Sequence, residues 1–191
     1  MPKRRPANSS RNARSRSGVR VEKSKASGEW MLVHPRGVRD RSDDMEEVQT
    51  MLEAGELDIA IDELRWLLGG CPDFIEAHQL LGVLALSADN DVPLARGHFG
   101  FAYDIGRKAI RQAGDPAPLR QSQPANQAFF AAGQGLAFCL LRQEKQQQAR
   151  QVIEQLLHCD PSDPLALRAM AAGEEEVQVH QLEKWPGEAP G

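Results

Sequence analysis

Histidine and cysteine are the residue types in this sequence that could ligate a metal ion or supply a nucleophile. The chain of 191 residues contains five histidines and three cysteines. His158 and Cys159 are adjacent, so at a helix end their side chains point in different directions, which is poor geometry for two ligands of one ion. The spacings C-x-x-C, H-E-x-x-H and H-x3–5-H do not occur, and no motif supplies a third group to orient a Cys–His pair. We therefore expect no metal, no cofactor and no enzyme activity.

Three glycines are a second candidate for chemistry, because glycine-rich loops bind phosphate through backbone N–H groups. Gly97, Gly100 and Gly106 lie in a segment with helical periodicity, no strand precedes them, and no Lys-Ser or Lys-Thr pair follows. A phosphate site is therefore not expected. Inside a helix each glycine costs about 1 kcal/mol relative to alanine. We expect these glycines to permit the close approach of a neighbouring helix.

The charge of the chain is divided unevenly. The net charge is −4, but residues 1–36 contain ten lysines or arginines and two acids, whereas residues 37–191 contain 13 bases and 25 acids. The first segment has almost no aliphatic periodicity, so it cannot bury enough apolar surface to offset the entropy of ordering it. We expect residues 1–36 to be a disordered basic arm, with the apolar run 30–33 docking on the edge of the folded part.

The basic arm has two interpretations, a solubilising tail or a weak, salt-dependent contact with a polyanion such as RNA. It has no aromatic residue before Trp30 to stack on bases, so sequence-specific recognition is not expected. The candidate polyanion contacts are Arg4, Arg5, Arg11, Arg14, Arg16 and Arg20.

Composition also limits the compartment. The mean hydropathy is −0.49, and no stretch approaches the roughly 18 to 20 apolar residues of a membrane span. The first twenty residues contain no apolar core of a secretory signal, and the odd number of cysteines, none in a C-x-x-C pair, is not a disulfide framework. We expect a cytoplasmic protein with no membrane contact.

Apolar residues with a helical period predict an all-α fold. Alternation of apolar and polar residues long enough for a sheet is absent from the sequence. The predicted helices cover about residues 45–54, 57–68, 75–87, 93–113, 126–142, 145–158 and 164–172. We expect a helical domain over residues 37–172, followed by an acidic flexible tail over residues 173–191.

The most specific pattern is a repeat in every second predicted helix. Ala60, Ala95 and Ala149 are each followed by a large apolar residue four positions later. The first and third of these alanines are also followed by proline at +12, in Pro72 and Pro161. A small residue lets the preceding helix approach, the large residue fills the space beside it, and proline ends the unit.

This pattern resembles the tetratricopeptide repeat, a helix–turn–helix unit of 34 residues. The resemblance covers about residues 43–170 as three units with a capping helix. It departs from the family pattern because the aromatic residue at the first position is missing and because Ala95 and Ala149 are 54 residues apart. A generic helical bundle is the alternative.

The resemblance implies a non-enzymatic module that binds a peptide or helix of a partner protein in a concave groove, lined by the first helix of each unit. The carboxylate clamps of this family use lysine and arginine at such positions, and here the stripe is apolar with amide groups, so an apolar segment is the expected ligand. A nucleic-acid- or ribosome-associated protein that uses its basic arm is the alternative function. The implied groove residues are Met45, Gln49, Leu52, Gln79, Val83, Leu86, Gln134, Phe138 and Leu141.

Overall fold

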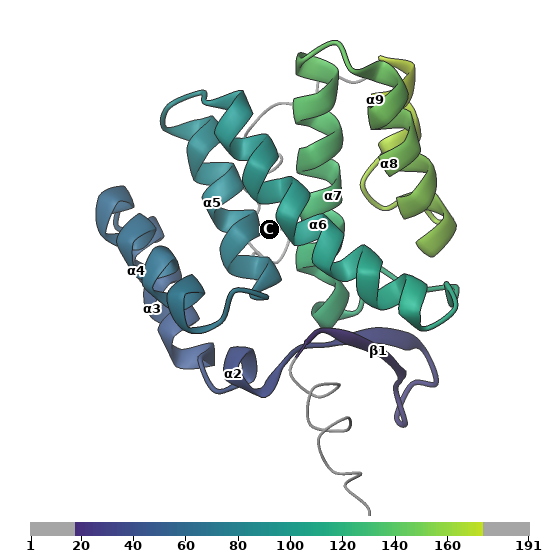
Figure 1. The fold of residues 1–191 in the computed structure, drawn as a ribbon, viewed down its shortest axis with the longest axis horizontal. Helices are drawn as coiled ribbons and strands as arrows, with labels where there is room; N and C mark the ends of the chain where they lie inside the picture. The colour runs from purple at the N-terminus through teal and green to yellow at the C-terminus, as the bar shows by residue number, and fades with distance from the viewer. Residues whose placement is uncertain (1–17, 174–191) are drawn as a thin grey trace, which may run out of the picture.

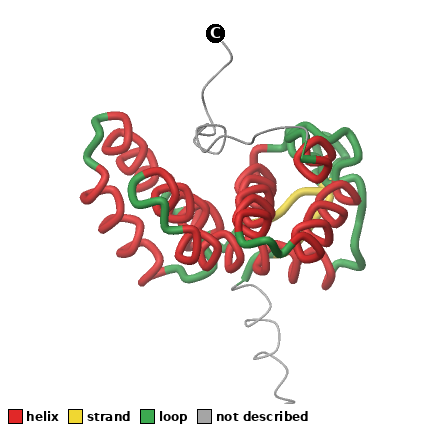
Figure 2. The backbone as a smooth tube through the Cα atoms, turned by 90° about the horizontal axis from the view of Figure 1, so that it is seen from above, coloured by secondary structure: helices red, strands yellow, loops and turns green. Residues whose placement is uncertain are grey.

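The computed structural model describes residues 18–173, which form a curved array of helices with a two-stranded sheet at one edge (Figures 1 and 2). The predicted features of residues 1–17 and 174–191 lie outside this range. The elements are β1 Arg20–Lys23, β2 Trp30–Val33, α2 Arg36–Arg39, α3 Ser42–Glu53, α4 Leu57–Gly70, α5 Ile75–Ser87, α6 Val92–Gln112, α7 Pro124–Arg142, α8 Gln146–Cys159 and α9 Leu167–Ala172.

The mostly helical fold confirms the sequence prediction, and the long helices begin and end near the predicted positions. Local signals explain the ends. Asp91 precedes α6 and accepts a hydrogen bond from the backbone N–H of Leu94, while Pro93 and Pro124 lie in first turns, where proline is favoured. The seventh predicted helix is shorter than expected, because α9 begins only at Leu167.

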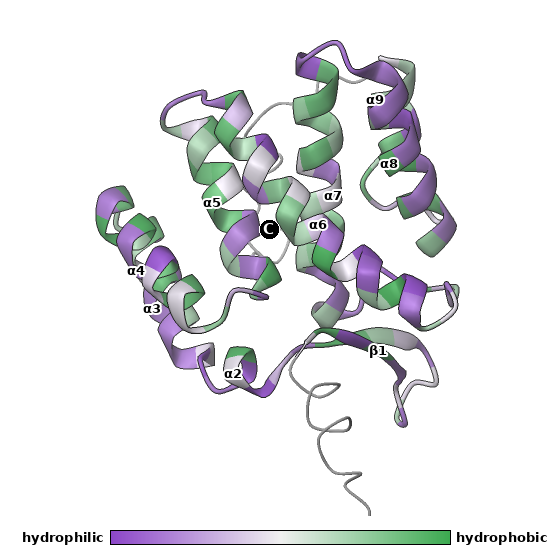
Figure 3. Cartoon of the chain, viewed as in Figure 1, coloured by the Kyte–Doolittle hydropathy of each residue, from purple (hydrophilic) through white to green (hydrophobic). Residues whose placement is uncertain are grey.

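Helix α5 lies at the centre of the packing. Consecutive helices from α3 to α9 pack against one another, and α5 also packs against α7. One side of α5 joins the apolar cluster of α3 and α4, and its other side joins the larger cluster of α6, α7, α8 and α9. Figure 3 shows α5 and much of α7 as apolar, whereas α8 is largely polar on the side in view. A helix between two clusters must be apolar on almost all sides, as α5 is.

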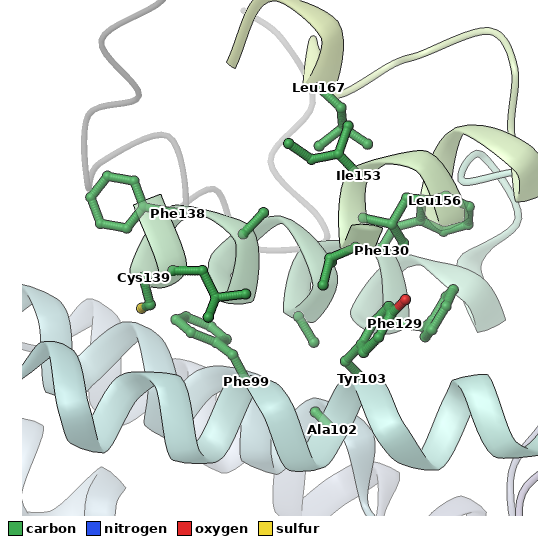
Figure 4. Packing of buried hydrophobic residues seen from close by; sticks show 14 of the residues in the cluster. Phe99, Ala102, Tyr103, Phe129, Phe130, Phe138, Cys139, Ile153, Leu156 and Leu167 are labelled. Atoms are coloured by element: carbon green, nitrogen blue, oxygen red, sulfur yellow. The ribbon is translucent and has the colours of Figure 1, made fainter. Parts of the chain in front are cut away.

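Small residues set the distances between these helices. Ala60, Ala95 and Ala149 are all fully buried, in agreement with their place in the repeat. Phe99 of α6 is also fully buried, and its ring lies against two glycines on different helices, Gly82 of α5 and Gly135 of α7. Figure 4 shows Phe99 pointing from α6 towards α7. The three central helices therefore meet around one phenylalanine ring.

A β-hairpin within residues 18–36 corrects two predictions, that this part of the arm is disordered and that the chain contains no sheet. β1 and β2 pair antiparallel, with Arg20 opposite Val33 and Lys23 opposite Trp30. The hairpin packs on α6 and α7, and Leu32 is fully buried there. The apolar run 30–33 thus docks on the folded part as expected, but as a strand. Docking on the helices stabilises the hairpin, since an isolated hairpin with strands of four residues is marginal in water.

Asn126, in the first turn of α7, connects the hairpin to the helices. It is fully buried, and its Oδ1 accepts a hydrogen bond of 2.8 Å from the backbone N–H of Leu32. Its Nδ2 donates to the carbonyl oxygens of Arg120 at 2.8 Å and Trp30 at 3.3 Å. One amide side chain therefore joins β2 both to α7 and to the loop that precedes it, although β2 lies more than 90 residues earlier in the sequence.

Candidate functional site

The concave stripe implied by the repeat pattern is mostly buried. Gln49 and Leu141 are partly exposed, but the other seven residues are buried: Met45, Leu52, Gln79, Val83, Leu86, Gln134 and Phe138. These seven side chains are therefore covered by the chain itself. The physical reason is the central place of α5, because Val83 and Leu86 pack in the larger apolar cluster, while Met45 and Leu52 pack in that of the first helix pair.

The third-unit residues of the stripe make contacts within the chain. Gln134 Nε2 donates to the carbonyl oxygen of Leu165, in the loop before α9. Phe138 projects from α7 on the side away from Phe99 (Figure 4), and the Arg142 guanidinium lies 5.8 Å from its ring centroid. Binding of a partner by the stripe stays a prediction that these contacts do not favour.

Of the candidate polyanion contacts, five arginines lie outside residues 18–173. Arg20 is the sixth, in β1, and its Nε donates to Glu22 at 2.6 Å. This carboxylate offsets part of the charge of Arg20. A polyanion contact through any of these arginines stays a prediction.

The three thiols are structural. Cys71, Cys139 and Cys159 are free and buried, and burial raises the pKa of Cys139 to about 12 and that of Cys159 to about 11. Burial also raises the pKa of Cys71. A nucleophilic cysteine needs a lowered pKa and access to solvent, so these thiols are unsuited to that chemistry.

Two histidines meet between α5 and α6. The Nδ1 atoms of His78 and His98 lie 3.3 Å apart, and His78 Nε2 lies 3.2 Å from the carbonyl oxygen of Pro72. A carbonyl only accepts, so Nε2 of His78 carries the proton, its Nδ1 is the acceptor, and His98 Nδ1–H donates. Burial lowers the pKa of both histidines. The charge of His98 lowers that of His78 further and Asp73 raises it, while Arg65 lowers that of His98.

We expect acidification from pH 7.5 to 5.5 to weaken the fold through this pair. Because the folded-state pKa of each histidine lies below the ordinary value near 6.5, the unfolded chain takes up protons first as the pH falls. The stabilisation is thus present above pH 6.5 and is lost below it. Urea midpoints across this range should fall less in His98→Gln than in wild type. His158→Gln, at an exposed position on α8, is the control; equal slopes in all three proteins would contradict the prediction.

Four large apolar side chains are exposed in the described part of the chain, and they share one register. Ile59 and Trp66 lie one residue before and six residues after Ala60, and Leu94 and Phe101 hold the same positions relative to Ala95. They are 54%, 60%, 47% and 49% exposed, in that order. The third unit has glutamine at both positions, Gln148 and Gln155. The exposed faces of α4 and α6 therefore each carry two large apolar side chains at equivalent positions.

A hollow of about 610 Å³ lies between α6 and α8, beside Phe101. Gly97, Gly100, Leu136, Leu140 and Val152 form the apolar part of its lining. Its polar lining is Arg96, Tyr103, Asp104, Gln148, Gln151 and Gln155. This α6–α8 groove is the candidate functional site.

Two glycines of the groove correct the packing prediction. A Cβ atom on Gly106 would collide with the ring of Phe129, so that glycine does permit close packing. By contrast, no atom lies within 4 Å of a Cβ on Gly97, and a Cβ on Gly100 would make an ordinary contact of 3.7 Å with Leu136. Packing inside the chain thus gives no reason for glycine at positions 97 and 100.

Neither a membrane-spanning helix nor a metal site is found among residues 18–173. No helix in this range has the length and apolar character to cross a bilayer, and no group of three His, Cys, Asp or Glu side chains is placed to hold a metal ion. Comparisons of the chain with protein-family models, with curated proteins and with solved structures found no match.

Proposed function

We propose that this protein is a binding module of tetratricopeptide-like helix pairs that holds an apolar segment of a partner protein in the α6–α8 groove. The observation that carries the proposal is the pair of open glycines, Gly97 and Gly100, beside the half-exposed Phe101. The proposed docking surface is therefore the groove between α6 and α8 in place of the concave stripe. Binding is favoured over catalysis because the described thiols are buried and protonated.

The cost of the glycines supports a partner in the groove. Each costs about 1 kcal/mol in a helix interior, and neither Gly97 nor Gly100 offsets that cost by packing within the chain. Glycine lets another backbone approach closely, so a partner helix or strand lying across α6 would gain contact area there. Phe101, next in sequence to Gly100, supplies an aromatic anchor of the kind that carries binding energy.

The polar lining indicates how the partner segment is held. Gln148 and Gln151 of α8 are exposed, and their amide groups can both donate and accept. Arg96 lies at the groove with a buried Nε that has no hydrogen-bond partner among the described residues. A partner that places a carbonyl or carboxylate oxygen near this Nε would satisfy it. The groove thus fits an apolar segment with one hydrogen-bond acceptor at its edge.

Crosslinking tests the site, and a glycine substitution tests the affinity. A photoreactive residue at Gln148, in the groove wall, should capture the partner, whereas the same residue at the neighbouring Gln147, outside the groove, should not. For the captured partner, Gly97→Leu should fill the groove and weaken binding about tenfold or more, near 1.4 kcal/mol. Calorimetric titration measures this loss.

The matched control is Gly69→Leu, because Gly69 is also exposed in a helix with open space around its Cβ position, but lies on α4. It should leave the affinity within about twofold, since a surface substitution away from the contact has little effect. Equal crosslinking from positions 147 and 148, or equal affinity of wild type and Gly97→Leu, would refute the proposed function.

A further inference from the structure

The outer face of α4 is an unpartnered helix face. We define it by Ile59, Asp62, Glu63 and Trp66, which recur at helical spacing. Ile59 and Trp66 are more than half exposed. The Arg41 guanidinium lies 5.1 Å from the ring centroid of Trp66, which shows that this aromatic face accepts an arginine.

Charge makes this face complementary to one segment of the same chain. The helix pair of residues 42–70 has nine acids and a single base, Arg65, which pairs with Asp62 at 3.2 Å. Residues 1–17 have six lysines or arginines and no acid. Opposite charges on tethered segments attract, and arginine stems also cover apolar surface such as Ile59 and Trp66.

The place where the described chain begins brings that segment to α4. Gly18 lies beside Asp73, because a Cβ on this glycine would be 3.7 Å from the Asp73 carboxylate. Asp73 belongs to the loop that joins α4 to α5, so the chain enters next to the end of α4. Seventeen residues can span up to roughly 56 Å, while a helix of 14 residues is about 21 Å long. The reach is therefore ample.

We propose that residues 1–17 dock on the outer face of α4, with arginine side chains stacked on Trp66 and paired with the carboxylates of Asp62 and Glu63. The arm can then not hold a polyanion and this face at the same time, so the two contacts compete. The proposal goes beyond the α6–α8 groove and does not depend on it.

Paramagnetic relaxation tests the contact in the full chain. The cysteine thiol of the Ser9→Cys variant should react selectively with a spin label, because the three natural thiols are buried with raised pKa values. At 0.1 M salt it should weaken the amide signals of α4 and the indole N–H signal of Trp66 at least about twofold more than those of α8. At 1 M salt the difference should vanish, since the screening length falls from about 10 Å to about 3 Å. Heparin should remove it as well.

Two charge-matched variants decide whether α4 is the docking face. Asp58→Asn, Asp62→Asn and Glu63→Gln together should abolish the broadening, while Glu46→Gln, Glu47→Gln and Glu53→Gln on α3 should retain most of it. Equal loss of the broadening in both variants would overturn the proposal. Equal broadening of the α4 and α8 signals in the labelled wild-type background would overturn it as well. Mixing labelled protein with isotope-enriched unlabelled protein reports contacts between molecules. Broadening of α4 in that mixture would assign the face to a second copy and also overturn it.

Discussion

Gly135→Ala should destabilise the protein by about 1 to 2 kcal/mol, although alanine is the better helix former. A Cβ atom at this position would lie 2.6 Å from the Phe99 ring, which is fully buried and also contacts Gly82. The ring has little room to move, because it also lies against Gly82, where a Cβ would be 2.7 Å from it. Overpacking of a filled core costs about 1 to 3 kcal/mol, and we expect the upper half of that range here because the ring touches glycines on two helices. Subtracting the roughly 1 kcal/mol of helix propensity gained leaves a net loss of about 1 to 2 kcal/mol. Urea denaturation measures the net change.

Gly97→Ala is the matched control for this first prediction, since it makes the same change in a helix interior where nothing lies within 4 Å. It should stabilise the protein by about 0.5 to 1 kcal/mol. In addition, Phe99→Leu combined with Gly135→Ala should cost less than the sum of the two single changes, because the smaller side chain leaves room for the methyl group. Strict additivity would show that Gly135 and Phe99 do not share one packing site.

Asn126→Ala should cost about 2 to 4 kcal/mol. Three hydrogen bonds disappear with the amide group, and the backbone N–H of the fully buried Leu32 loses its partner. An unsatisfied buried donor costs about 1 to 3 kcal/mol, and the lost packing of the side chain adds to this. Urea denaturation gives the total, and amide hydrogen exchange at Leu32 should become faster by more than the global destabilisation explains.

Gln123→Ala is the control for Asn126→Ala. Gln123 also bonds to the hairpin, through Glu29, but it is only partly buried, so its loss should cost less than about 1 kcal/mol. If the two substitutions destabilise the protein equally, the buried amide of Asn126 has no special role.

The helices could be predicted from the sequence because a periodic apolar face is a local signal. Proline and glycine marked several ends, and Ala60, Ala95 and Ala149 fell at buried positions as the repeat pattern required. The hairpin could not be found this way. Its strands have four residues each, and β1 carries three charged residues out of four. Its stability comes from docking on α6 and α7, which is a long-range property.

The candidate site was harder to predict because its location depends on which helix lies in the middle. The repeat pattern assigns the first helix of each unit to the concave face, so it placed Val83 and Leu86 there. In the structure α5 has apolar residues on almost all sides and is buried between two clusters. The open glycines were visible in the sequence, but Gly97 and Gly106 look alike there. The two are distinguished only by the atoms around the Cβ position, which are those of Phe129 at Gly106 and are absent within 4 Å at Gly97.

The link between Leu32 and Asn126 has a consequence for how the chain is made. The two residues are 94 positions apart in the sequence. At the usual 5 to 20 residues per second, a ribosome needs roughly 5 to 19 seconds to add the partner that the hairpin requires. During that interval α3 to α6 can form from local contacts, while the strands lack the α7 part of their docking surface. The first segment of the domain to be synthesised is thus among the last to reach its final place.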